Sequence, residues 1–322
     1  MKLVIQIPCH NEEATLPATL ADLPTHLPGF DTVEWLVIDD GSSDRTGDVA
    51  RAHHVHRVVR FPARRGLARA FETGLREALA MGADVVVNTD ADNQYQGADV
   101  ATLVQPILEG RADMVVGTRP IDDIKHFSPL KKLLQRVGSG VVRRLSSTDV
   151  PDATSGFRAF SREAALRLTV LTTFSYTLET IIQAGEKNIA LAHVPVRTNP
   201  KLRESRLFTS TTAYVQRSLA TMLRVYILYQ PLRFFMSFAA LFLLVACVLF
   251  VRFFLVWLEK PLATGHVQSL LVGGVCAIIG VLFVALGVLA DLTAMNRRLL
   301  EEIVVNTRSL RAERSRKGGN AQ

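Results

Sequence analysis

The chain has 322 residues, of which 48% are hydrophobic, and a formal net charge of +7. This apolar content excludes an intrinsically disordered protein, and the scattered positions of the only three cysteines (Cys9, Cys247 and Cys276) predict neither a disulfide nor a zinc site. The positive charge favours an anionic partner, and nucleic acid, anionic lipid and phosphorylated substrates are all compatible with it.

Strand-like and helix-like stretches alternate over roughly the first 200 residues. The predicted strands are Leu3–Ile7, Trp35–Ile38, Val58–Phe61, Val85–Val87 and Met114–Val116. The predicted helices are Glu12–Leu23, Thr46–Ala52, Gly66–Met81 and Val100–Leu108. Alternation of this kind predicts an α/β domain whose mostly parallel sheet is covered by helices on both faces. The first strand is too short for a signal peptide, so we expect this domain to stay in the cytosol.

Polar clusters follow four of these strands directly. They are Pro8–Glu13, Asp39–Asp44, Asn88–Gln94 and Gly117–Arg119. Each cluster alone is explained by helix caps and turns. The carboxyl ends of parallel strands meet at one edge of the sheet, however, and ligands bind there. We therefore expect the four clusters to form one site.

The triplet Asp90-Ala91-Asp92 places two carboxylates on the same side of an extended segment. Carboxylates are hard oxygen ligands, and two of them can hold Mg²⁺ or Mn²⁺ while water and a diphosphate fill the other positions. Taken alone, such a triplet is more often part of a surface loop.

Two apolar segments follow the α/β domain. Residues 234–251 carry no formal charge, the apolar run resumes to Leu258, and residues 267–290 are again uncharged. A helix needs about 20 apolar residues to cross a bilayer, so both segments qualify as spans and form a hairpin. Arginines precede the first span and follow the second, which predicts that both ends face the cytoplasm.

The segments on either side of the hairpin also have compositions that predict their structure. Residues 209–232 mix aromatic residues with Arg217 and Arg224, as in a helix lying on the membrane surface. We expect a catalytic domain over 1–208, this amphipathic helix over 209–232, the hairpin over 233–291, and a basic cytoplasmic helix with a disordered tail over 292–322.

The motifs in this order resemble those of the inverting family 2 glycosyltransferases, which have the GT-A nucleotide-sugar fold. The similarity rests on Pro8–Glu12, Val37–Thr46, Arg65-Gly66 and Asp90–Gln94. With Gly117–Arg119 and Asp152–Arg158 added, the chain is similar to the branch of dolichyl-phosphate mannose synthase and its bacterial polyprenyl-phosphate relatives. The resemblance covers roughly residues 2–210.

The resemblance implies roles for individual residues. Residues expected to contact the nucleotide-sugar are Pro8, Asn11, Glu12, Asp39, Asp40 and Asp90. The implied metal ligands are Asp90, Asp92 and Gln94. Residues expected at the acceptor phosphate are Arg119, Arg136, Ser139 and Arg206, and the catalytic set is Asp152, Asp92, Arg119 and Arg158. A lipid phosphate is already anionic, so we interpret Asp152 as orienting the acceptor or an arginine, with general base as the alternative.

The resemblance implies a metal-dependent enzyme that transfers one sugar, with inversion, from a GDP- or UDP-sugar to undecaprenyl or dolichyl phosphate. We expect it in the cytoplasmic membrane, with both termini cytoplasmic, and expect no nucleic-acid partner. Homo-oligomers are compatible with the hairpin glycines.

The alternatives are an inactive membrane scaffold of the same fold and a processive polysaccharide synthase, although the Gln-x-x-Arg-Trp motif of the latter is absent. The sequence does not support a nucleotidyltransferase, because it contains no glycine-rich phosphate-binding loop.

Overall fold

The computed structural model describes residues 1–119, 149–170, 176–200, 220, 223–224, 226–259 and 267–319. The chain divides into two compact units, one formed by Met1–Met222 together with Val304–Gln322 and the other by Leu223–Ile303. The first unit holds a seven-stranded sheet and its helices, and the second holds two long helices.

The sheet has the strand order β3-β2-β1-β4-β6-β5-β7. Its strands are β1 (Lys2–Cys9), β2 (Thr32–Asp39), β3 (Arg57–Arg60), β4 (Val85–Asn88), β5 (Met114–Thr118), β6 (Arg158–Ser161) and β7 (Leu191–Pro195). All neighbouring pairs are parallel except those of β6, which runs antiparallel to both β4 and β5. This is the mostly parallel, Rossmann-like sheet of the GT-A fold that the motifs predict.

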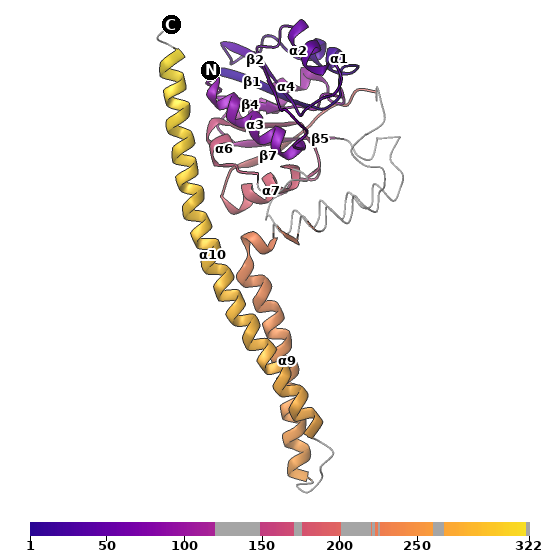
Figure 1. Cartoon of the computed structure of the whole chain (residues 1–322), viewed down its shortest axis with the longest axis vertical. Helices are drawn as coiled ribbons and strands as arrows, with labels where there is room; N and C mark the ends of the chain where they lie inside the picture. The colour runs from indigo at the N-terminus through magenta and orange to yellow at the C-terminus, as the bar shows by residue number, and fades with distance from the viewer. Residues whose placement is uncertain are drawn as a thin grey trace. The chain divides into compact units, whose positions relative to one another are not determined.

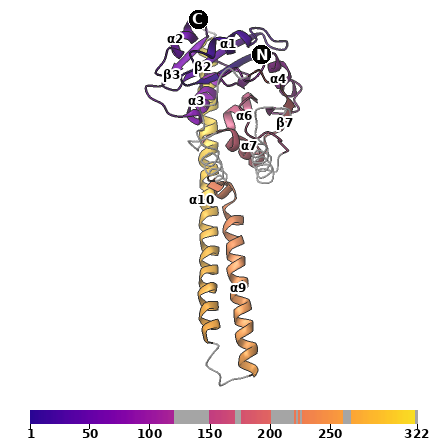
Figure 2. The same ribbon diagram turned by 90° about the vertical axis from the view of Figure 1, so that its right-hand side faces the viewer.

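Helices cover both faces of the sheet, as Figures 1 and 2 show. They are α1 (Leu16–Asp22), α2 (Thr46–Ala52), α3 (Leu67–Ala80), α4 (Val100–Leu108), α6 (Arg162–Arg167) and α7 (Tyr176–Glu186), with a 3-10 turn, η1, over Gly97–Asp99. Alternate residues of β1 face opposite sides: Leu3 and Ile5 join the core under α1 and α4, whereas Gln6 faces α3. Strands buried on both faces explain the unbroken apolar runs of the sequence.

Several elements differ from the sequence-based expectations. The first helix begins at Leu16 rather than Glu12, because the Glu12 carbonyl closes a turn and Pro17 stands in the first turn of the helix. Strands β6 and β7 and helices α6 and α7 were not predicted. Strand β6 has only four residues and contains a charged one, so no period-2 apolar pattern marks it.

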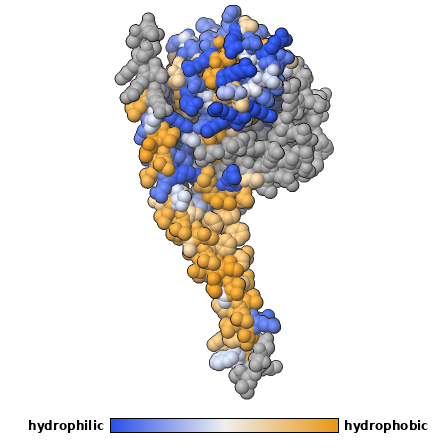
Figure 3. All heavy atoms as spheres, viewed as in Figure 1, coloured by the Kyte–Doolittle hydropathy of each residue, from blue (hydrophilic) through white to orange (hydrophobic). Residues whose placement is uncertain are grey.

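The second unit is a pair of antiparallel helices, α9 (Pro231–Glu259) and the first part of α10 (Val267–Gly319). Both are long and apolar enough to span a membrane by length and composition. Small residues bring them together: a Cβ on Gly280 would lie 2.7 Å from Leu243 Cγ, and one on Gly273 would lie 2.9 Å from Phe250 Cε1. Apolar side chains cover the outside of the pair, as the orange surface in Figure 3 shows.

The predicted disordered tail was wrong for its first part, because α10 continues to Gly319. Arg, Ala and Glu dominate residues 311–316, and these residues favour helix. The predicted surface helix over 209–232 lies largely outside the described residues, and only its last residues are described, including Pro231, where α9 begins.

Candidate active site

The loops after β1 and β2 are joined by hydrogen bonds at the carboxyl edge of the sheet. The strands end in register, with Cys9 beside Asp39. The Asn11 N–H donates to Ser42 Oγ at 3.0 Å, and the Ser43 N–H donates to Asn11 Oδ1 at 2.8 Å. Asn11 has a φ of 57°, a left-handed conformation that asparagine tolerates. The two predicted nucleotide loops therefore form one surface.

Glu12 is buried within the same surface. Its backbone N–H donates to Thr46 Oγ1 at 2.8 Å, and its carboxylate accepts a hydrogen bond from Thr15 Oγ1 at 2.7 Å. Thr46 is the first residue of α2, so Glu12 connects the start of that helix to the loop after β1. These contacts give Glu12 a structural part in shaping the loop.

Asp39 and Asp40 are both almost fully buried and hold different loops. Asp39 accepts from the Ser42 N–H at 2.9 Å and pairs with Arg60 Nε at 3.3 Å. Asp40 accepts from the Gly66 N–H at 2.9 Å and from the Arg65 N–H at 2.6 Å. Direct contact of these carboxylates with a base or ribose stays a prediction, and Arg60, which was not predicted, is the half-exposed charge beside them.

Asp90 and Asp92 follow β4 and are partly buried. Burial, followed by the charge of Asp92, raises the pKa of Asp90 to about 7, while Arg119 acts in the opposite direction. No donor within the described part of the chain hydrogen-bonds to the Asp90 carboxylate, whereas Asp92 accepts from the Gln94 N–H at 3.1 Å. Two mutually repelling carboxylates, one of them without a hydrogen-bond donor among the described residues, suit a divalent metal ion.

The metal site would have to be completed by other ligands. Among the described residues, no three His, Cys, Asp or Glu side chains gather in an arrangement that could hold a metal. Two carboxylates and the Gln94 side chain are a hard-oxygen donor set that fits Mg²⁺ or Mn²⁺ if water and ligand oxygens supply the remaining positions.

Gly156 allows the backbone after Asp152 to approach Asp90 closely. A Cβ at this position would lie only 2.7 Å from Asp90 Oδ2, too close for any other residue type without a shift. The Gly156 carbonyl accepts from Asn88 Nδ2 at 2.8 Å, and its N–H donates to Tyr95 Oη at 3.2 Å. The segment around Gly156 is thus fastened to both ends of the loop that carries Asp90 and Asp92.

Arg119 and Asp152 form a two-pronged ion pair. Nε of Arg119 donates to Asp152 Oδ2 at 2.7 Å, and Nη2 donates to Asp152 Oδ1 at 3.0 Å and to Thr154 Oγ1 at 3.0 Å. Burial alone would raise the pKa of Asp152, but the Arg119 guanidinium and hydrogen bonds hold it below its usual range. An ionised carboxylate with both oxygens engaged is a poor general base.

Arg158 is fully buried at the start of β6. Its guanidinium donates to the carbonyls of Ser155 at 2.7 Å, Ala153 at 2.9 Å and Thr177 at 2.8 Å, and to Thr180 Oγ1 at 2.6 Å. Burial lowers the pKa of Arg158 to about 10. This geometry favours a positioning role for Arg158, because its donors shape the 152–158 turn, and its predicted place in the catalytic set stays a prediction.

Sequence reasoning missed three residues that support the site, Gln6, Tyr95 and Tyr176. The buried Gln6 amide donates to Asn88 Oδ1 at 2.8 Å, and Asn88 in turn donates to Tyr176 Oη at 2.8 Å. Tyr95 stacks on Phe157 with ring centroids 4.9 Å apart. Gln6, a polar residue inside the apolar run of β1, was the available signal for this network, whereas Tyr176 lies in a helix that was not predicted.

Arg136, Ser139 and Arg206 lie outside the described residues, so their predicted contacts with the acceptor phosphate remain expectations. The remaining predicted residues come together at one edge of the sheet. The charges that most affect Asp90 are those of Asp92, Arg119, Glu12 and Arg158, which come from four separate segments of the chain.

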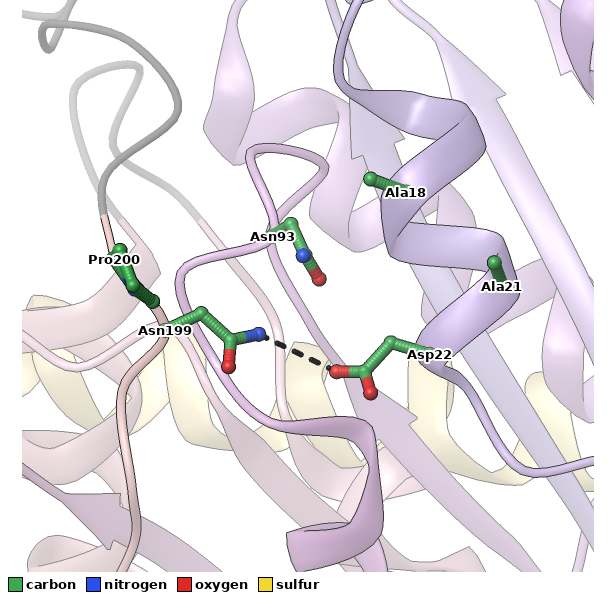
Figure 4. A pocket seen from close by; sticks show the side chains of 6 residues that line it. All are labelled: Ala18, Ala21, Asp22, Asn93, Asn199 and Pro200. Carbon is green, nitrogen blue, oxygen red and sulfur yellow. Dashed lines mark hydrogen bonds between the residues drawn. The ribbon is translucent and has the colours of Figure 1, made fainter.

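An open depression of about 430 Å³ lies beside this edge (Figure 4). It is lined by Ala18, Ala21, Asp22, Asn93, Asn199 and Pro200. Only Asn93 belongs to the loop that carries the paired carboxylates, and its Oδ1 has no hydrogen-bond partner within the described residues. Neither Asp90 nor Asp92 lines the depression, so it is separate from the predicted metal site.

Comparison with known proteins identifies related chains. The sequence model of the protein family described as Glycosyl transferase family 2 matches residues 4–169 of this chain. The UDP-N-acetylglucosamine–dolichyl-phosphate N-acetylglucosaminyltransferase of Methanococcus voltae is 30% identical over 217 residues, which cover 60% of this chain and 83% of that protein. The undecaprenyl-phosphate mannosyltransferase of Micrococcus luteus is 32% identical over 170 residues, covering 50% of this chain and 66% of that protein.

A solved structure is similar over the catalytic region. Glucosyl-3-phosphoglycerate synthase from Mycobacterium tuberculosis, in complex with Mn²⁺, UDP-glucose and phosphoglyceric acid, superposes with a TM-score of 0.56 at 25% identity. The match covers 70% of this chain and 79% of that one.

Proposed function

Because the chain belongs to glycosyl transferase family 2, we propose that it moves one sugar from a GDP- or UDP-linked donor to a polyprenyl phosphate, with inversion at the anomeric carbon. The observation that carries this proposal is the presence of a GT-A domain and two long apolar helices in one chain. A membrane hairpin keeps an enzyme at the surface where a lipid acceptor is found. Two of the relatives are named for transfer to polyprenyl phosphates.

The donor would bind across the loops after β1, β2 and β4. The Asn11–Ser42–Ser43 hydrogen bonds and the buried Asp39 and Asp40 hold these loops in place. Asp90, Asp92 and Gln94 would hold Mg²⁺ or Mn²⁺, which when bound would neutralise charge on the diphosphate leaving group. The Mn²⁺ complex of the mycobacterial structure supports the use of a divalent metal ion.

In the transfer step, an oxygen of the lipid phosphate would form a bond to the anomeric carbon as the bond from that carbon to the nucleoside diphosphate breaks. The nucleophile is already an anion, so alignment and charge compensation matter more than proton removal. Arg119 would serve this task, and the two contacts of its guanidinium with Asp152 support the proposal. Asp152 would therefore orient Arg119 rather than act as a base, and Arg158 would fix the turn that carries Asp152.

The acceptor class can be tested directly. Membranes containing the full chain would be given a labelled nucleotide-sugar with polyprenyl phosphate, with polyprenol that lacks the phosphate, or with phosphoglyceric acid. The proposal predicts label in an organic-extractable product with polyprenyl phosphate only. Transfer to phosphoglyceric acid instead would show that the acceptor is soluble and would sink the lipid proposal.

A further inference from the structure

The helix pair contains an arginine whose guanidinium nitrogens are shielded from solvent and make no hydrogen bond within the described residues. Arg297 lies in α10, and its guanidinium carbon sits 4.2 Å from the ring centroid of Tyr229. Its Nε lies 3.5 Å from Glu301 Oε1, one helical turn further on. All three groups belong to the Leu223–Ile303 unit, so the arrangement is a property of that unit by itself.

The guanidinium lacks the hydrogen bonds that such burial requires. The side chain is 17% exposed, and Nε, Nη1 and Nη2 are shielded from solvent without a hydrogen-bond partner in the described part of the chain. The tyrosine covers a face of the group and does not satisfy its N–H donors. A buried charged donor without an acceptor is destabilising, which makes a missing ligand the physical explanation to test.

The position of Arg297 indicates which acceptors are available. The uncharged run of α10 ends at Ala290, seven residues before Arg297, or about 10 Å along the helix axis. Tyr229 lies five residues before the first uncharged run, which starts at Phe234. The polar headgroup layer on each side of a bilayer is about 5–8 Å thick, so both residues would lie at or just beyond this layer. The acceptors concentrated there are lipid phosphates, and tyrosine and arginine are the side chains suited to that boundary.

We propose that Arg297, stacked on Tyr229, forms a lipid-phosphate site on the helix pair, built from residues other than those of the predicted active site. The planar guanidinium can meet two phosphate oxygens with its Nη groups while Tyr229 supports its face. Glu301, whose Oε1 lies 3.5 Å from Arg297 Nε, compensates part of the charge. The site depends on the membrane association proposed above, but not on the sugar-transfer reaction.

Two lipids share the required chemistry, the phosphomonoester of polyprenyl phosphate and the phosphodiester of phosphatidylglycerol. The full chain would be purified in detergent, delipidated and titrated with each lipid and with its phosphate-free counterpart, polyprenol or diacylglycerol, while native mass spectrometry counts bound lipid. Arg297→Gln would be compared with Arg298→Gln, because Arg298 is the adjacent arginine and is exposed. Thermal unfolding of each variant would establish that it is folded.

The expected result is a preference of the wild type for a phosphate-bearing lipid that falls roughly tenfold in Arg297→Gln and is kept in Arg298→Gln. A preference confined to polyprenyl phosphate identifies the acceptor lipid as the occupant, and a preference for both identifies a general headgroup site. Equal binding of each lipid and its phosphate-free counterpart, or an unchanged preference in Arg297→Gln, overturns the proposal.

If Arg297→Gln does not fold, Arg297→Lys takes its place, because lysine keeps the charge and loses the two-pronged geometry. If Arg297→Lys binds the phosphate-bearing lipid more weakly than the wild type does, and binds the phosphate-free lipid equally well, the result would support the proposed site. If Arg297→Lys binds both lipids as the wild type does, the result would refute the proposed site. Because this experiment measures lipid binding and not sugar transfer, failure of the lipid-phosphate site is distinguishable from failure of the proposed reaction.

Discussion

At the scale of single residues, the charged side chains of the site are held in position by ion pairs and hydrogen bonds. Asp152 holds Arg119 at two points, and Arg158 holds the carbonyls on either side of Thr154. From the sequence, Asp152, Arg119 and Arg158 were assigned to one catalytic set because the resemblance to the family implies it. The sequence could not show that Arg158 points into the core, because a buried arginine and an exposed one have the same spacing in a motif.

Replacing Arg119 by lysine tests whether its two-pronged contact matters. Lysine keeps the positive charge but cannot bridge both oxygens of Asp152, so the charge facing the reacting groups would be less well placed. We expect kcat/KM for the lipid acceptor to fall roughly 10- to 100-fold, as for loss of one charge-assisted hydrogen bond. Steady-state transfer kinetics measure this, with Arg111→Lys at an exposed ion pair as the control. Equal losses in both variants would contradict the assigned role.

At the scale of elements, strands with continuous apolar runs were predictable and the remaining ones were not. The predicted strands within β1, β2, β4 and β5 are confirmed, since a central parallel strand must be apolar on both faces. Strand β6 was missed because its residues Arg158–Ser161 are held by the antiparallel ladder and by the hydrogen bonds of Arg158, neither of which leaves a sequence period.

Arg158→Met should destabilise the α/β unit as a whole. The change leaves three buried carbonyls, of Ala153, Ser155 and Thr177, without this donor. At roughly 1 kcal/mol or more for each carbonyl, we expect a loss of about 3 kcal/mol in the free energy of unfolding. Thermal or denaturant unfolding measures it, with Arg69→Met at an exposed position as the control. An unaltered unfolding midpoint with lost activity would instead favour direct contact of Arg158 with substrate.

The packing of α9 against α10 depends on which glycine faces the partner helix. A Cβ on Gly280 would meet Leu243, whereas one on Gly274 has nothing within 4 Å. Gly280→Ile should therefore separate the helices and lower the melting temperature of the chain in detergent, and Gly274→Ile should leave it within experimental error. The opposite order, or equal shifts, would show that the two helices pack through other faces.

At the scale of the whole molecule, the chain combines a family 2 glycosyltransferase domain with two helices that are apolar on their outer surface. The two long apolar helices were predictable from length and hydropathy, because a helix long enough to cross a bilayer needs little more than an uninterrupted apolar run. The identities of the sugar and of the nucleotide were not predictable, because the contacts that distinguish one donor from another come from individual side chains around the site.

The central claim is that this chain transfers a sugar to a lipid phosphate through the site around Asp90 and Asp92. The most direct measurement is incorporation of label from a panel of GDP- and UDP-sugars into organic-extractable polyprenyl phosphate with Mg²⁺ or Mn²⁺ present. Native chain would be compared with Asp92→Ala and with Asp48→Ala, an exposed control. We predict incorporation from one donor, abolished in Asp92→Ala and retained in Asp48→Ala. Nucleotide binding without transfer from any donor, or full transfer by Asp92→Ala, would contradict the account.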